Sequence, residues 1–187
     1  MNRDGGENGT RLLVLERKSR STLRHSLRRI PILALIVLFV SLLIFRAIGT
    51  LGISPFSSWI ACTRFALAIM FLFTSSAHFT KMRHDLARMM PNIFPNPMAM
   101  VYFTGICEIF GAVGILVPRT RSLAGLCLCV FLLCILPANV KAAREGLAIG
   151  GRSATALWLR VPMQALFLVL TFWSTQPWLL FSHRLTS

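Results

Sequence analysis

The chain has 187 residues, of which 55% are hydrophobic and only 14% are charged, and its mean hydropathy is +0.68. One soluble domain of this length cannot bury so much apolar surface, so the composition excludes an ordinary soluble protein and indicates a lipid environment. The formal net charge is +14, and eight of the twenty Lys and Arg residues precede Ile30. This basic segment leads directly into an apolar run and holds no aromatic residue for base stacking, which favours contact with anionic lipid over nucleic acid.

The first segment, residues 1–29, is a basic tail rich in Gly, Asn and Ser near its start, and we expect it to be largely disordered. The apolar run that follows, residues 30–53, predicts an extra N-terminal transmembrane helix if the Arg46 side chain extends to the membrane surface. A cleaved signal peptide is the alternative interpretation. The basic region is long for a signal peptide, and no clear small-residue cleavage site follows it.

Four further apolar runs predict a four-helix transmembrane bundle over residues 59–181, so the expected fold class is an all-α membrane protein. The loop 80–97 contains three prolines that keep it non-helical near its end. The second basic connection, 141–160, contains three glycines that break helices. The four runs are 59–79, 98–117, 122–140 and 161–181.

The distribution of basic residues predicts the orientation of these spans. With five spans, fifteen Lys and Arg residues lie on the side of the N-terminus and five lie on the other side. The positive-inside rule then predicts a multi-pass protein of the cell (inner) membrane with a cytoplasmic N-terminus. If residues 30–53 do not cross, the remaining four spans take the opposite orientation.

Glu108 lies alone in the centre of a twenty-residue apolar run from Met98 to Val117. A charge at the centre of a transmembrane helix costs roughly 2.5 to 3.5 kcal/mol on insertion scales, so we expect Glu108 to face the bundle interior and to have a partner. Small residues share its face within about 60° on the helical wheel and would let another helix approach closely. They are Thr104, Gly105, Gly111 and Ala112.

Two other predicted spans also carry polar stripes. Arg64 and His78 lie within about 40° of each other on one helix, and Arg160 and Gln164 share a face on the last span. Asn139 is near the inner end of its span and should come level with His78. The candidate intramembrane polar site therefore consists of Arg64, His78, Glu108, Asn139, Arg160 and Gln164.

Depth along the helices predicts an ion pair between Arg64 and Glu108. Counted from the inner ends of their antiparallel spans, the two residues differ in depth by about 7 Å, which an arginine side chain can bridge. The alternative is that the polar residues form an internal clamp that fixes helix register and does no chemistry.

Several short motifs resemble those of DoxX-like membrane proteins. They are Arg64, Ala77-His78-Phe79, the run 104–116 closed by Pro118-Arg119-Thr120-Arg121, and Pro137-Ala138-Asn139-Val140. The similarity covers about residues 59–175. It implies a four-helix membrane bundle, and it implies a membrane redox setting because some members are linked to thiosulfate:quinone oxidoreduction or to complexes that handle thiol stress. It carries over no catalytic role for Arg64, His78 or Glu108.

The expected function is that of a non-catalytic or accessory subunit associated with a membrane redox process that involves quinone or thiol stress. No haem, flavin or iron–sulfur motif is visible in the sequence, so a membrane partner protein would supply the electron carrier, and no cofactor is evident beyond a bound quinone. The chain also lacks a C-x-x-C pair and a nucleophile motif, which argues against an autonomous enzyme. The alternative function is a membrane binder or carrier of a lipid, a sterol-like molecule or a quinone. The oligomeric state stays open.

Overall fold

The computed structural model describes residues 30–176 apart from 92, 147, 150–151 and 154–156. The predicted disorder of the tail, residues 1–29, lies outside the described residues, and so does the end of the last predicted span, 177–181.

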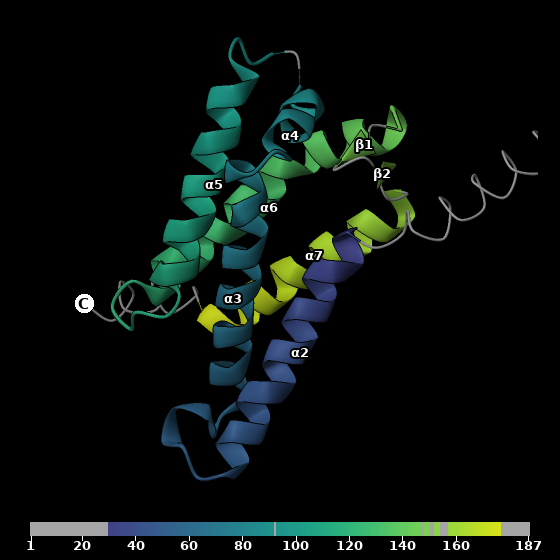
Figure 1. Ribbon diagram of the computed structural model, residues 1–187. Helices are drawn as coiled ribbons and strands as arrows, with labels where there is room; N and C mark the ends of the chain where they lie inside the picture. The colour runs from purple at the N-terminus through teal and green to yellow at the C-terminus, as the bar shows by residue number, and fades with distance from the viewer. Residues whose placement is uncertain (1–29, 92, 147, 150–151, 154–156, 177–187) are drawn as a thin grey trace, which may run out of the picture.

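Five long helices account for most of the described chain (Figure 1), and each coincides within a few residues with a predicted apolar run. Apart from one two-residue antiparallel strand pair, the described residues are helical or irregular, which confirms the predicted all-α class. The long helices are α2 (Ile30–Thr50), α3 (Trp59–Phe79), α5 (Pro97–Gly114), α6 (Arg121–Arg144) and α7 (Leu157–Thr175). The short elements are η1 (Ser54–Phe56), α4 (Arg83–Met89), β1 (Ala148–Ile149) and β2 (Arg152–Ser153).

The connections contain more structure than the sequence pattern indicates. The seven-residue helix α4 lies in the first half of the loop 80–97, and α6 continues beyond the predicted end of its span. Tertiary packing explains both differences, because Met89 of α4 and Ala142 of α6 are buried against each other. The Lys141 Nζ also donates a hydrogen bond of 2.8 Å to the carbonyl of Met90.

The helices α3, α5, α6 and α7 form a closed ring in which each helix packs against two others. The contacts run from α3 to α5, from α5 to α6, from α6 to α7 and from α7 back to α3. The helix α2 packs along α3 (Figure 1). The predicted arrangement of four bundled helices with an additional N-terminal helix is therefore present in the fold.

Four of the described helices are long and apolar enough to cross a membrane, namely α2, α3, α5 and α6. The helix α7 is not one of the four. It carries Arg160, Pro162 and Gln164 in its first half. The length and composition of these four helices are thus compatible with four of the five predicted membrane spans. A membrane crossing by α7 stays a prediction.

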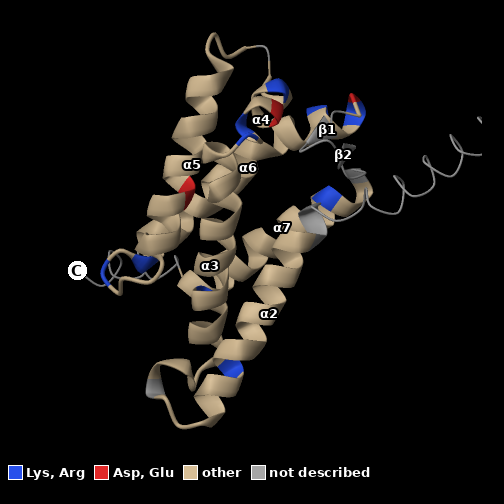
Figure 2. Cartoon of the chain, in the orientation of Figure 1, with Lys and Arg blue, Asp and Glu red and all other residues tan. Residues whose placement is uncertain are grey.

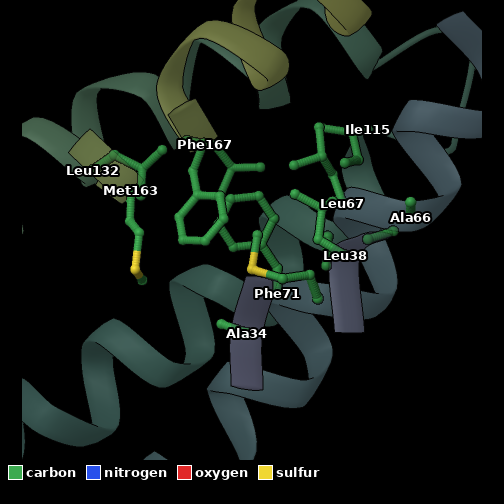
Figure 3. Close-up of a cluster of buried hydrophobic side chains, with 13 residues drawn as sticks. Ala34, Leu38, Ala66, Leu67, Phe71, Ile115, Leu132, Met163 and Phe167 are labelled. Atoms are coloured by element: carbon green, nitrogen blue, oxygen red, sulfur yellow. The ribbon is translucent and has the colours of Figure 1, made fainter. Parts of the chain in front are cut away.

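A single cluster of apolar side chains fills the space between the long helices (Figure 3). It includes Ala34 and Leu38, so α2 reaches the same core as the ring of four helices. Large apolar side chains also cover the outside, where Phe110 of α5 is 73% exposed, as expected of helices whose outer faces contact lipid. The other labelled members of the core are Ala66, Leu67, Phe71, Ile115, Leu132, Met163 and Phe167.

The small residues of α5 face the neighbouring helices, as predicted. A methyl group placed on Gly105 would lie 2.6 Å from the Cβ of His78 in α3, and one placed on Gly111 would lie 2.4 Å from a methyl of Leu128 in α6. The absence of a side chain at Gly105 therefore allows α3 and α5 to approach closely at the level of His78.

The orientation of the helices can be tested with single cysteines at Ser57, before α3, and at Ile93, between α4 and α5, in a background that lacks the five native cysteines. Both residues are exposed, and Ile93 is 82% exposed. We expect a membrane-impermeant thiol reagent to label Ser57→Cys from outside and Ile93→Cys only after the cytoplasmic face is opened. Labelling of both positions from one side would contradict a membrane crossing by α3.

The close approach at Gly105 can be tested with Gly105→Ala. The added Cβ overlaps the Cβ of His78, whose position is fixed by the backbone, so the helices must separate. We therefore expect a loss of about 1–3 kcal/mol in the free energy of unfolding. Unfolding in mixed detergent micelles, followed by tryptophan fluorescence, measures this loss. Ile106→Ala is the matched control, since Ile106 is 45% exposed on the outer face of the same helix. Equal stability of Gly105→Ala and the control would show that the helices are not in close contact there.

Candidate functional site

The acidic residue in the middle of α5 is buried and meets α3 (Figure 2). The side chain of Glu108 is 8% exposed. Its Oε1 accepts a hydrogen bond of 3.1 Å from the hydroxyl of Thr74, and its Oε2 lies 3.6 Å from the Nε2 of His78. The prediction that Glu108 faces the bundle interior and has partners is therefore confirmed.

The hydrogen bonds of His78 determine which of its ring nitrogens carries a proton. Its Nδ1 lies 2.8 Å from the carbonyl oxygen of Val101, which can only accept a hydrogen bond. The hydroxyl of Thr104 donates to the same carbonyl at 2.9 Å and therefore presents a lone pair to the Nδ1, which is 3.2 Å away. Both neighbours require a donor, so the Nδ1 carries a proton.

A proton is also required between His78 and Glu108. With the Nδ1 protonated, a neutral imidazole presents the lone pair of its Nε2 to the Oε2 of Glu108. Two acceptors 3.6 Å apart repel each other in a site of low dielectric constant. The contact is favourable when one proton resides on either group, giving a carboxylic acid beside a neutral imidazole or a carboxylate beside an imidazolium. The Oε2 has no hydrogen-bond partner among the described groups. The pair thus holds one proton and retains an unused acceptor.

The predicted ion pair between Arg64 and Glu108 is wrong. The Nε of Arg64 donates to the carbonyl of Ile60 in its own helix, at 3.5 Å. The prediction placed the end of α3 level with the start of α5, whereas the contact with His78 is made by Gly105, eight residues or about 12 Å into α5. This offset moves Glu108 away from the level of Arg64 and toward the other end of α3.

A second polar cluster joins α6 to α7 and contains the other three predicted residues. The Nη1 of Arg160 donates to the Oδ1 of Asn139 at 3.1 Å, and the Nδ2 of Asn139 donates to the Oε1 of Gln164 at 3.1 Å. The Nε2 of Gln164 donates in turn to the backbone carbonyl of Leu132. The structure therefore divides the six predicted residues into this cluster, the His78–Glu108 pair, and Arg64, which joins neither.

The second cluster lies next to Pro137 inside α6, which stays one continuous helix from Arg121 to Arg144. Proline lacks the N–H that would bond the carbonyl four residues earlier, here that of Leu133. Gln164 bonds the adjacent carbonyl of Leu132. The cluster thus ties α7 to the turn of α6 that precedes Pro137, which is the function of a structural clamp.

Thr74, whose hydroxyl contacts Glu108, was not among the predicted site residues. The signal was present, because Thr74 lies four residues before His78 and therefore on the same helix face. The role of the Val101 carbonyl had no sequence signal, since every residue carries such a group.

Comparison with known proteins assigns the chain to a family. The chain belongs to a family described as a domain of unknown function (DUF8561), whose profile matches residues 67–176, more than half of the chain. No curated protein and no solved structure matches the chain. The matched region includes His78, Glu108 and the second polar cluster, and it ends with α7. The resemblance to DoxX-like proteins stays a prediction.

The shared proton can be tested by comparing Glu108→Gln with Glu108→Leu. A glutamine amide can donate to the Nε2 of His78 and still accept from Thr74, so we expect an unfolding free energy close to that of the wild type. Leucine leaves the buried Nε2 without a partner, at a cost of about 1–3 kcal/mol. The measurement is unfolding in mixed detergent micelles.

The matched control for these variants is Arg64→Leu. Because Arg64 does not touch Glu108, the effects of Arg64→Leu and Glu108→Leu should add to within about 0.5 kcal/mol in the double variant. A larger coupling, or equal losses in Glu108→Gln and Glu108→Leu, would contradict the assigned contacts.

Proposed function

We propose that this chain is a multi-pass protein of the cell (inner) membrane, with a cytoplasmic N-terminus, that binds the head group of a lipid-soluble quinone at the His78–Glu108 pair. We propose that it acts there as a non-catalytic subunit of a membrane redox process. The observation that carries the proposal is the contact of 3.6 Å between the His78 Nε2 and the Glu108 Oε2, which holds one proton and leaves the Oε2 without another partner.

The chemistry of the pair suits a quinone. A quinone carbonyl accepts a hydrogen bond, and a quinol hydroxyl donates one. The contact of 3.6 Å between Nε2 and Oε2 is too long for a full hydrogen bond, so the proton of the pair stays available to a quinone carbonyl, and the unused lone pairs of the carboxyl group offer an acceptor. Few polar groups in apolar surroundings are typical of sites for lipid-soluble molecules.

The location of the pair also supports binding from the lipid phase. Glu108 lies eleven residues after the start of α5, which is about 16 Å along the helix. The side chain of His78 remains 15% exposed, so the imidazole edge of the pair can be reached from outside the helices, whereas the Oε2 of Glu108 is buried behind it. An isoprenoid tail would then lie along the apolar outer faces of α3 and α5.

The subunit role follows from what these residues supply. His78, Glu108 and Thr74 provide a proton and hydrogen bonds, whereas quinone reduction also needs two electrons, which a partner protein would deliver. The resemblance to DoxX-like proteins supports the redox setting.

A second candidate function is the binding or transport of a lipid or a sterol-like molecule. The orphaned Oε2 of Glu108 favours it, because a hydroxyl head group can donate to this oxygen whether or not the molecule is redox-active. The two functions differ in the head group that the pair would recognise.

Binding can be measured with the purified protein in neutral detergent by following its unfolding temperature during titration with decylubiquinone. We expect a saturable increase for the wild type and the loss of at least half of this increase in His78→Gln. The matched control is Ser76→Ala on the exposed face of the same helix, which should respond as the wild type does.

Two outcomes would contradict the quinone proposal. One is an equal response of His78→Gln and Ser76→Ala. The other is an increase with cholesterol hemisuccinate or a long-chain alcohol and none with decylubiquinone or its quinol, which would favour the binder of lipids or sterol-like molecules instead.

A further inference from the structure

Two arginines, Arg64 and Arg121, lie at the same level of the bundle, at the end where α3 and α6 begin. Thr74 of α3 lies opposite Glu108 of the antiparallel helix α5. Arg64 precedes Thr74 by ten residues, so it lies level with about residue 118, in the turn that leads directly to Arg121. Figure 2 shows basic residues at this turn. Helix register alone thus brings the two side chains to the same level.

The contacts of these arginines leave their charges uncompensated. Arg64 and Arg121 carry like charges at the same level of the bundle, and both side chains are partly buried. The Nε of Arg121 is buried and has no hydrogen-bond partner among the described groups. The Nε of Arg64 reaches only a carbonyl of its own helix, that of Ile60. Two like charges that are partly removed from water raise the energy of the fold unless an anion lies between them.

No described carboxylate serves as that anion. Asp85 bonds Arg88, and Glu108 is held by His78 and Thr74. Glu145 follows the far end of the 24-residue helix α6, about 36 Å from Arg121. The remaining three of the six acidic residues lie in the segment 1–29, outside the described residues.

We propose that Arg64 and Arg121 together bind a phosphate group, carried either by a lipid head group or by a free phosphate-bearing molecule. Guanidinium groups match the oxygens of phosphate with paired hydrogen bonds, and two of them compensate a phosphate charge better than one. Arg121 is also the first residue of α6, whose unpaired backbone N–H groups add positive potential at the same place.

The nearby residues place this site at the level of a membrane surface. Trp59 begins α3, and the guanidinium of Arg46 lies 4.8 Å from the centre of its ring. Tryptophan paired with arginine is typical of the interface between lipid and water. The site is about 15 Å from the Thr74–Glu108 contact along α3, so it goes beyond the proposed quinone site and does not depend on it.

The test is the unfolding temperature of the purified full chain in neutral detergent at constant ionic strength. The probes are dioctanoyl phosphatidylglycerol, inorganic phosphate and dioctanoylglycerol, which lacks a phosphate. We expect phosphatidylglycerol to raise the unfolding temperature of the wild type and dioctanoylglycerol to leave it unchanged. An increase with inorganic phosphate as well would identify a site for free phosphate, and an increase with phosphatidylglycerol alone would identify a lipid site.

The variants Arg64→Gln and Arg121→Gln should each lose at least half of this increase. The matched control, Arg119→Gln, removes the same charge from an exposed position in the same turn and should keep the full increase. Equal responses of the three variants, or no response of the wild type to either phosphate probe, would overturn the proposal. Unfolding of Arg64→Gln or Arg121→Gln in the absence of any probe would also overturn it. Removal of one of two repelling charges should leave the protein without ligand at least as stable as the wild type without ligand.

Discussion

The axial register of α3 against α5 is the constraint on which both proposed sites depend. Gly105 sets it, because the absence of a side chain lets the backbone of α5 approach His78. From that point the helical rise brings Thr74 opposite Glu108 and leaves Arg64 at the level of the turn before α6. A change of one turn in this register would separate His78 from Glu108 and move Arg64 away from Arg121.

The polar groups inside the bundle are hydrogen-bonded to different extents. Between α6 and α7, side-chain amides and Arg160 bond one another and a backbone carbonyl near Pro137, so the polar atoms tie the two helices together. Between α3 and α5, a carboxyl group and an imidazole meet without a complete set of partners. The first arrangement has a structural role, and the second is the place where we propose that a ligand binds.

Three buried side-chain atoms of the described residues have no hydrogen-bond partner, namely the Oε2 of Glu108, the Nε of Arg121 and the Oγ1 of Thr171. Such atoms are costly in an apolar interior, which makes each of them a place where a ligand would stabilise the fold. Glu108 and Arg121 belong to the two sites proposed here. Nothing in the structure explains the orphaned hydroxyl of Thr171.

The helices and the faces that they turn inward could be predicted from the amino-acid residues alone. Apolar runs of sufficient length predicted five helices, and the periodicity of Glu108 with Gly105 and Gly111 predicted a buried carboxylate beside a close helix contact. The tertiary structure alone decided the partner of Glu108. Periodicity gives the angular position of a residue around its own helix but not the axial offset between two helices. That offset depends on the contact at Gly105 and on the α4 connection, and it selects His78 instead of Arg64.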